Sequence, residues 1–222
     1  DDGRLSGSGA DESEDGETAP AEYMSTYEGG WRGDMRWGHG IERDADGRVR
    51  EGEFERVMEG RGTERWPDGR VYEGEFRMSG FSGCGTMRWP SGSTYEGEWR
   101  NGRRWGHGTY RGADGREYVG EWAVGECDGR GTERDAGGRV VYEGEWRAGK
   151  RSGRGTSRSA RGVFEGEWKA GEREGRGTWR SADGLVHEGE WRAGRQARGR
   201  AFASPHARRS LPPRHRTLAF AP

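Results

Sequence analysis

The strongest constraint on the fold is a five-residue motif that the chain repeats. The sequence YEGEW occurs identically at 95–99 and at 142–146, and six variants of it occur elsewhere. The first residues of the eight copies lie at 27, 50, 72, 95, 118, 142, 164 and 187, at intervals of 22 to 24 residues. A fixed period of this length is the signature of stacked repeat units, which bury their apolar faces against one another. The sequence therefore predicts a repeat array rather than a conventional globular core.

The motif itself has the pattern of a β-strand. Aromatic residues usually occupy its first and fifth positions, glycine its third, and glutamate its second and fourth. Because successive side chains of a strand point to opposite faces, this alternation predicts one packed aromatic face and one face in water. Glycine weakens a strand interior, so we expect it to leave a slot in which a ring lies against bare backbone.

A second segment completes each repeat. Gly-x-Gly, usually followed by threonine, comes after the motif, as in GCGT at 83–86 and GRGT at 153–156. Short segments with glycine precede it, and Asp-Gly or a similar pair follows it; both are typical of tight turns. Each repeat is therefore expected to be a β-hairpin. The predicted fold class is all-β: an elongated single antiparallel meander of about eight hairpins with disordered tails.

The pattern Tyr-x-Gly-x-Trp followed by Gly-x-Gly, with a period of about 23 residues, resembles the MORN (membrane occupation and recognition nexus) repeat. The resemblance covers 27–200 and implies an elongated, twisted sheet with an aromatic-lined groove that serves as an adaptor or membrane-associated module. Arg50 and His187 replace the first aromatic residue of their copies. Arg198 and Arg200 stand in the Gly-x-Gly positions of the last copy, which is therefore expected to be partial. The expected structural repeat positions are Tyr27, Trp31, Tyr72, Phe76, Tyr95, Trp99, Tyr118, Trp122, Tyr142, Trp146, Phe164, Trp168 and Trp191.

The two ends of the chain differ from the array in composition. Residues 1–26 contain eight acidic residues and one arginine, whereas residues 201–222 contain four arginines and no acid. We therefore expect an acidic disordered tail at 1–26, the repeat array at 27–200, and an Arg/Pro-rich tail at 201–222. Leu, Ile, Val and Phe total only 20 of 222 residues, so the packed face has to be built from aromatic rings.

No catalytic or metal-binding constellation stands out in the sequence. His39 and His107 occupy the variable position of Gly-x-Gly, and Cys84 and Cys127 lack metal-ligand spacing. The paired glutamates recur identically from repeat to repeat, which favours a solvated face over a catalytic pair in a shaped pocket. The sequence predicts no enzyme, no metal, no cofactor and no small-molecule substrate. A catalytic domain elsewhere in a longer parent chain stays open.

Two functions follow from the surface of such an array. The first is a non-catalytic scaffold or adaptor that binds a protein partner. Aromatic residues outside the repeat frame are the candidate partner contacts: Trp37, Trp105 and Trp179. The second is a peripheral membrane module that binds anionic phospholipid. Its candidate lipid contacts are Arg103, Arg104, Lys150, Arg151, Arg208 and Arg209.

A third function is that of a regulatory segment in a larger enzyme. Arrays similar to this one accompany phosphatidylinositol phosphate kinase and methyltransferase domains, although no residue here supports either activity. The array itself is nearly neutral, with 33 basic and 31 acidic residues in 27–200, which weakens the phospholipid hypothesis and disfavours nucleic acid. We therefore expect a protein partner first, in a cytoplasmic setting peripheral to a membrane or cytoskeletal structure.

Overall fold

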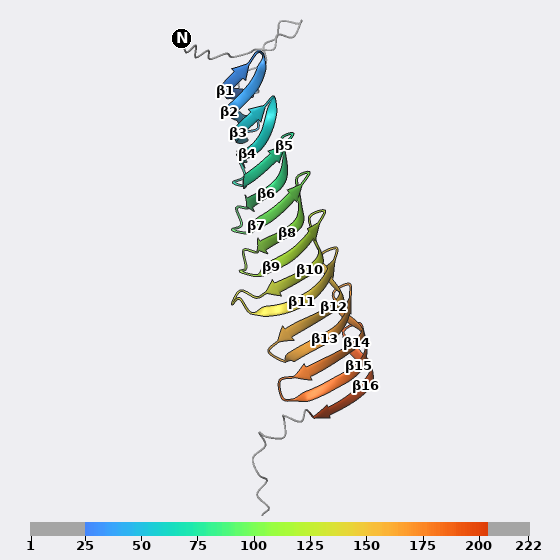
Figure 1. The fold of residues 1–222 in the computed structure, drawn as a ribbon. Coiled ribbons are helices and arrows are strands. Elements are labelled where there is room, and N and C mark those ends of the chain that lie inside the picture. Colours follow the sequence, from blue (N-terminus) through green and yellow to red (C-terminus); the bar gives the residue numbers. More distant parts are fainter. Residues whose placement is uncertain (1–24, 204–222) are drawn as a thin grey trace, which may run out of the picture. The chain divides into compact units, whose positions relative to one another are not determined.

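The computed structural model describes residues 25–203, which contain sixteen β-strands and no helix. The strands are β1 (Thr26–Arg32), β2 (Met35–Arg43), β3 (Val49–Glu55), β4 (Val57–Arg65), β5 (Val71–Arg77), β6 (Gly80–Arg88), β7 (Thr94–Arg100), β8 (Arg103–Arg111), β9 (Glu117–Ala123), β10 (Glu126–Arg134), β11 (Val140–Arg147), β12 (Lys150–Ser159), β13 (Gly162–Lys169), β14 (Glu172–Ser181), β15 (Leu185–Arg192) and β16 (Arg195–Ala203). They form one open antiparallel sheet in which sheet order equals chain order (Figure 1). The predicted meander of hairpins is confirmed. Most of both predicted tails lies outside the described residues.

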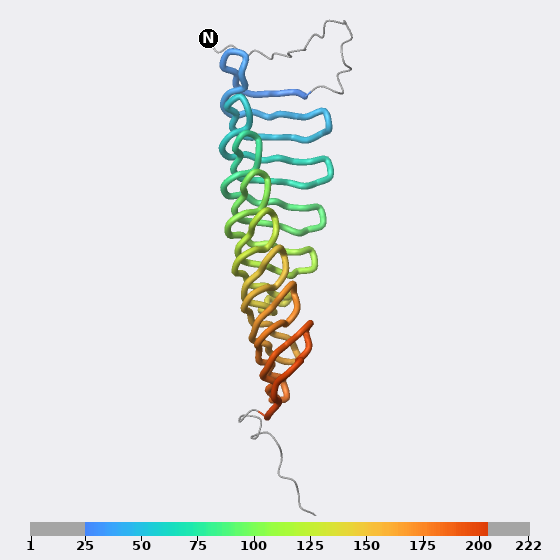
Figure 2. Tube along the Cα trace, turned by 90° about the vertical axis from the view of Figure 1, so that its right-hand side faces the viewer, coloured from blue at the N-terminus to red at the C-terminus, as the bar shows by residue number. Residues whose placement is uncertain are grey.

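The chain divides into two compact units. The first unit extends to Cys127 and includes the turn at 135–138, whereas the second comprises Asp128–Arg134 and the residues from Arg139 onward. Strands β1 to β9 therefore belong to the first unit, and β11 to β16, with most of β10, belong to the second. Within each unit, successive hairpins lie side by side along the chain (Figure 2).

The hairpin of β7 and β8 illustrates how the repeat folds. Its turn, Asn101 and Gly102, has φ values of 50° and 72°, the left-handed conformation that two-residue hairpin loops favour. Farther along the hairpin, Gly97 lies opposite Gly108, and the register shifts immediately after Gly97. Such a β-bulge leaves backbone groups without a partner in the ladder. The second unit has an equivalent shift after Gly144.

The bulge explains the tyrosine at the first position of the motif. The hydroxyl group of Tyr95 donates a hydrogen bond to the carbonyl oxygen of Glu98 at 3.0 Å, next to the register shift. Burial raises the pKa of Tyr95 to about 12, which keeps this donor protonated. The ring crosses the paired glycines, because a Cβ atom on Gly108 would lie 2.4 Å from the Tyr95 hydroxyl. The predicted slot of bare glycine backbone under a ring is confirmed.

The tryptophan at the fifth position joins each repeat to the one before it. The indole Nε1 of Trp99 donates to the carbonyl oxygen of Gly85 in the preceding hairpin at 3.0 Å. In the second unit, Trp168 donates to Gly155 in the same way, also at 3.0 Å. The ring of Trp99 also lies edge-on to that of Tyr95, with centroids 5.1 Å apart. The two aromatic positions of the motif therefore stabilise both the hairpin and its contact with the neighbouring hairpin.

The second repeat fills this layer partly with charged side chains, while the fully buried Met58 takes the place of the ring against the paired glycines. Arg50, which replaces the aromatic residue, pairs with Glu42 on one neighbouring strand at 2.6 Å and with Glu64 on the other at 3.6 Å. The two glutamates are only 7% and 3% exposed. Arg48 also contacts Glu64, at 3.2 Å. Desolvation nevertheless raises the pKa of Glu64 above its ordinary value. We call Arg50, Glu42 and Glu64 the ionic layer.

In the last repeat, the positions that correspond to Gly-x-Gly lie one residue away from where the sequence analysis placed them. Gly199 lies opposite Gly189, so Gly199 is the second glycine of this repeat. Arg198 consequently occupies the variable position and Arg200 the threonine position. The placement of these two arginines in the Gly-x-Gly positions was wrong, because the pairing of glycines across the strands sets the register. Both strands of this hairpin, β15 and β16, are formed.

Candidate functional site

The face of the second unit opposite the aromatic residues carries three parallel rows, and we call it the polar face. The Glu–Thr row alternates across neighbouring strands and consists of Glu143, Thr156, Glu165, Thr178 and Glu188. The Arg–Glu row contains the cross-strand pairs Arg154 with Glu167 and Arg176 with Glu190. Between the two rows the backbone is a glycine row, made of Gly144, Gly155, Gly166, Gly177 and Gly189.

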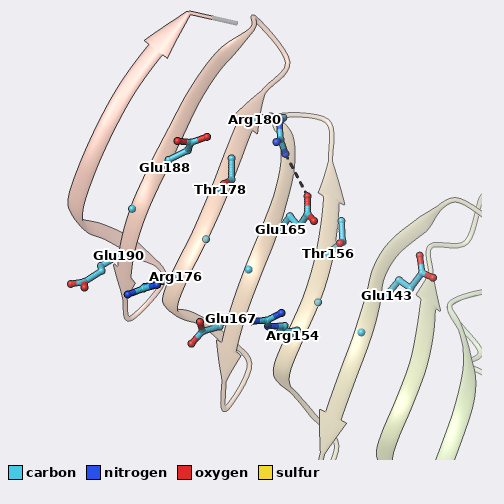
Figure 3. Close-up of a pocket in the computed structure, with 15 residues that line it drawn as sticks. Glu143, Arg154, Thr156, Glu165, Glu167, Arg176, Thr178, Arg180, Glu188 and Glu190 are labelled. Atoms are coloured by element: carbon cyan, nitrogen blue, oxygen red, sulfur yellow. Dashed lines mark ion pairs between the residues drawn. The ribbon is translucent and has the colours of Figure 1, made fainter.

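These rows line an open groove of about 770 Å³. In Figure 3, the Glu–Thr row and the Arg–Glu row lie on opposite sides of the glycine backbone. The lining contains five glutamates and three arginines, so acidic groups are in excess. The volume resembles that of small-molecule pockets, but those are enclosed and mostly apolar. An open groove lined by charges and bare backbone suits a polar chain better than an apolar small molecule.

The charges of the groove neutralise one another only in part. Arg180 and Glu165 form an ion pair at 3.5 Å, between side chains that are 55% and 68% exposed. Exposed pairs of this kind contribute at most about 1 kcal/mol. At one end of the row, Glu188 pairs with Arg200 at 3.0 Å. In the part of the chain that the structure describes, Glu143 has no ion pair. The Glu–Thr row therefore keeps carboxylates available to an external cation.

The glutamate at the fourth position of the motif has a structural role that the sequence did not predict. Glu98 accepts a hydrogen bond from the backbone N–H of His107 at 2.8 Å, and Glu145 accepts one from Arg154 at 3.0 Å. These N–H groups lie at the bulge, where the ladder leaves them unpaired. The two glutamates of the motif therefore differ, since the fourth-position carboxylate supports the hairpin whereas the second-position carboxylate belongs to the Glu–Thr row.

The tryptophans predicted to contact a partner lie in different surroundings. Trp37 and Trp105, in the first unit, are 42% and 36% exposed, and an arginine guanidinium lies 5.0 Å from each ring. Trp179, in the second unit, is half-buried and packs against an aromatic cluster, with Arg173 4.5 Å from its ring. Exposure thus distinguishes the first two candidates from the third.

Trp37 and Trp105 occupy a position that several other repeats fill with an acid. Glu59 accepts a hydrogen bond from the N–H of Met78 at 2.9 Å, and Glu174 stabilises its own neighbouring turn in the same way at 3.0 Å. An indole donates but cannot accept, so a tryptophan cannot perform this task. The acceptor role of this position therefore does not explain the two tryptophans, whose rings instead lie against Arg32 and Arg100.

The basic residues predicted to contact lipid do not share one face. Arg103 and Lys150 are exposed, whereas the next residue in each strand faces the aromatic side. The guanidinium of Arg104 lies 4.4 Å from the ring of Trp122, and desolvation lowers its pKa. Arg151 lies over an aromatic ring at 4.6 Å. The two remaining candidates lie outside the described residues: Arg208 and Arg209.

The aromatic face is largely occupied by its own packing. Tyr72, Tyr95 and Tyr142 are 0% exposed, although Trp31 in the first repeat is 47% exposed. Arginines fill the spaces between rings; Arg173, for example, lies within 5.4 Å of three ring centroids. Little of this face is left for a partner, and the polar face is the freer of the two.

Within residues 25–203, no group of three or more His, Cys, Asp or Glu side chains could hold a metal ion. Among the same residues, no helix has the length and apolar character needed to cross a membrane. Glu143 and Glu165, from the pairs that could suggest acid–base chemistry, are exposed at the open groove.

The fold and the repeated hairpin define a β-hairpin repeat protein with an open sheet. The family model for the MORN repeat matches seven times, at 27–47, 51–69, 72–94, 95–115, 118–138, 142–163 and 164–186. The chain therefore belongs to the MORN repeat family. No match was found among curated proteins.

Among solved structures, the chain is similar to the SAS-4 (dCPAP) TCP domain of Drosophila melanogaster, solved in complex with a proline-rich motif of Ana2 (dSTIL). The identity is 12%, with 69% of this chain and 72% of that chain covered and a TM-score of 0.25. BamB from Moraxella catarrhalis is 13% identical, with 75% and 70% covered and a TM-score of 0.20. Scores this low carry no argument about function.

Proposed function

We propose that this MORN-repeat chain is a non-catalytic scaffold or adaptor that binds a protein partner through the polar face of its second unit. The observation that carries the proposal is the groove between the Glu–Thr row and the Arg–Glu row. It is open, it has polar groups along its whole length, and its floor is glycine backbone. A protein chain can approach the strand backbone between the two rows, because the residues between them direct their side-chain positions toward the aromatic face.

The aromatic face supports the proposal by contrast. Aromatic residues and arginine dominate binding hot spots at protein interfaces, but only when they are free to contact a partner. On this chain most of them already pack against one another, as the fully buried Tyr142 and the stacked Arg151 illustrate. Binding through that face would require the repeats to give up their own contacts.

Phospholipid binding is the second candidate, and the charge distribution ranks it lower. Electrostatic attachment to an anionic membrane draws on roughly 1 kcal/mol for each basic residue near the surface, and acids on the same face oppose it. The groove lining carries five glutamates against three arginines. The described basic candidates are divided between two faces, so no single face combines them.

A pair of charge-reversal variants tests the proposal in the full chain. E143K/E165K reverses two carboxylates of the groove, whereas E126K/E172K reverses two exposed carboxylates next to hairpin turns. Both variants change the net charge by the same amount. We expect a partner that the wild-type chain retains in affinity capture to be retained by E126K/E172K and lost by E143K/E165K.

Co-sedimentation with vesicles provides the second arm of the test. The wild-type chain is expected to stay in the supernatant with anionic and with neutral vesicles alike. Equal retention of the partner by both variants would contradict the proposed face. Sedimentation with anionic vesicles alone would favour the phospholipid function instead.

A further inference from the structure

We infer that the groove of the second unit binds an extended, basic segment of the partner, in polyproline II conformation, with a cationic side chain at every third residue. This inference rests on the proposed function and adds the chemistry of the partner to it. Three properties of the groove carry it: the separation of its rows, the spacing of its carboxylates along the sheet, and the sign of its charge.

The separation of the rows excludes an α-helix as occupant. The Glu–Thr row and the Arg–Glu row are two residues apart along each strand, with a glycine between them, as for Glu165, Gly166 and Glu167. Two residues of a strand span about 6.8 Å. A helix with its side chains is about 10–12 Å wide and would rest on the rims. An extended backbone is narrow enough to approach the glycine row.

The spacing along the groove selects the conformation of the extended segment. Glu143, Glu165 and Glu188 lie on β11, β13 and β15, so one carboxylate of the Glu–Thr row recurs at every second strand. Strands are about 4.8 Å apart, which gives a period of about 9.6 Å. A polyproline II helix advances about 9.3 Å in one turn of three residues.

The mismatch between the two periods is small. It amounts to about 0.3 Å for each repeat and about 0.6 Å from Glu143 to Glu188, which a flexible arginine or lysine side chain can absorb. In a β-strand, by contrast, side chains three residues apart point to opposite faces. Only the polyproline II conformation therefore brings every third side chain to the same row of the groove.

The charge of the groove determines the sign of the charge that the partner segment carries. Its lining contains an excess of two carboxylates, five glutamates against three arginines. Glu143 has no ion pair among the described residues, whereas Glu165 pairs with Arg180 and Glu188 with Arg200 in surface ion pairs that a cationic partner can exchange. The threonines between the glutamates add hydroxyl groups, which can donate to the carbonyl oxygens that a polyproline II backbone leaves unpaired.

Fluorescence anisotropy with two synthetic peptides of identical composition tests the inference on the full chain. One peptide repeats Arg-Pro-Pro, and the other contains the same residues with its arginines grouped at one end. We expect the periodic peptide to bind at least about tenfold more tightly, a difference of about 1.4 kcal/mol. Equal affinities would overturn the inference, because a charged surface without the predicted period cannot tell the two peptides apart.

Matched variants locate the site. E143Q/E165Q/E188Q neutralises the carboxylates of the groove, and E55Q/E126Q/E172Q neutralises three exposed carboxylates that lie outside its rows. We expect the first variant to weaken binding of the periodic peptide at least about tenfold, and the second to leave it unchanged. Circular dichroism and thermal unfolding establish that both variants are folded.

The outcomes separate this inference from the proposed function. If neither peptide binds while E143K/E165K still loses its protein partner, the polar face is a docking site for a partner of another chemistry, and only the inference fails. If the periodic peptide binds equally to both neutralised variants, the groove is not its site, and the inference fails as well. If E143K/E165K also retains its partner, both proposals fall.

Discussion

Two repeats of the first unit solve the same packing problem with opposite chemistry. In the fourth repeat, the position that opens the motif is Tyr95, which is 0% exposed and lies edge-on to two tryptophan rings. In the second repeat, the equivalent residue is Arg50, held between Glu42 and Glu64. The glycine pairing is the same in both repeats, although the loop of the second hairpin is the single residue Arg56 where that of the fourth has two residues. The glycine pairs therefore specify the fold, and the layer between repeats accepts a charged filling in place of an aromatic one, even with the Nε atom of Arg50 buried and without a hydrogen bond.

The largest effect is expected from emptying the aromatic layer. Tyr95→Ala removes a fully buried ring and should lower the free energy of unfolding by about 3–5 kcal/mol. Urea denaturation followed by tryptophan fluorescence measures it. Tyr95→Phe is the control, since it removes only the hydrogen bond to Glu98 and should cost about 1 kcal/mol. A loss below that of the control would mean that the ring does not hold the layer together.

The next prediction tests whether an aromatic layer can replace the ionic layer of the second repeat. Arg50→Tyr removes the shared partner of the buried Glu42 and Glu64, which keep Arg36 and Arg48 respectively, and should destabilise the chain by about 2 kcal/mol. Adding E42M and E64M to this variant replaces the charges with apolar groups and should restore stability to the wild-type level or above it. The same denaturation experiment applies to both. If the triple variant is no more stable than the single one, the second repeat cannot accept an aromatic layer.

A smaller effect is expected from the contact between repeats. Trp99→Phe keeps a ring in the layer but removes the donor to the carbonyl oxygen of Gly85, at a cost of about 1 kcal/mol. The chain already contains this substitution at Phe76, which cannot donate. The reverse change, Phe76→Trp, should therefore be tolerated, with a change in the free energy of unfolding of no more than about 1 kcal/mol. An unchanged unfolding midpoint for Trp99→Phe would mean that the indole hydrogen bond does not contribute to stability.

The smallest effect distinguishes the two layers by pH. Desolvation raises the pKa of Glu64, so the contribution of this group to stability is fully present below its unfolded pKa and is lost as the pH rises through its folded pKa. Wild type should therefore gain stability relative to Glu64→Gln when the pH falls from about 7 to about 4. Glu51→Gln, at an exposed carboxylate, is the control. The opposite trend would mean that the two arginines outweigh the desolvation of Glu64.

The sequence was sufficient for the fold because the period, the alternation and the turn residues all indicate the same hairpin. The β-bulge has a mark in the sequence, the first glycine of Gly-x-Gly, which adopts a left-handed φ of 57° at Gly106. That glycine was interpreted only as part of the returning strand, so the bulge was not predicted. Because the bulge was not predicted, the hydrogen bonds that the Tyr95 hydroxyl and the Glu98 carboxylate make beside it were not predicted either. The ionic layer was also missed: Arg50 stood out as a departure, but its neighbours follow only from the register.

The candidate site was less accessible to sequence reasoning. The repeated glutamates were visible as a solvated face, but the division between the second and fourth positions depends on the bulge. The basic pairs at the turns do not form one surface, because adjacent residues of a strand point to opposite faces, as Arg103 and Arg104 do. Of the three tryptophans predicted to contact a partner, Trp37 and Trp105 lie at the surface, whereas Trp179 packs against an aromatic cluster.

Photo-crosslinking at two adjacent residues on opposite faces tests the docking face most directly. A photoreactive residue replaces Thr178 in the groove of the second unit, or Trp179 on the aromatic face; both residues are half-buried. With the captured partner bound to the full chain, we expect a covalent adduct from position 178 and none from position 179. An adduct from position 179 without one from position 178 would contradict the proposed docking face.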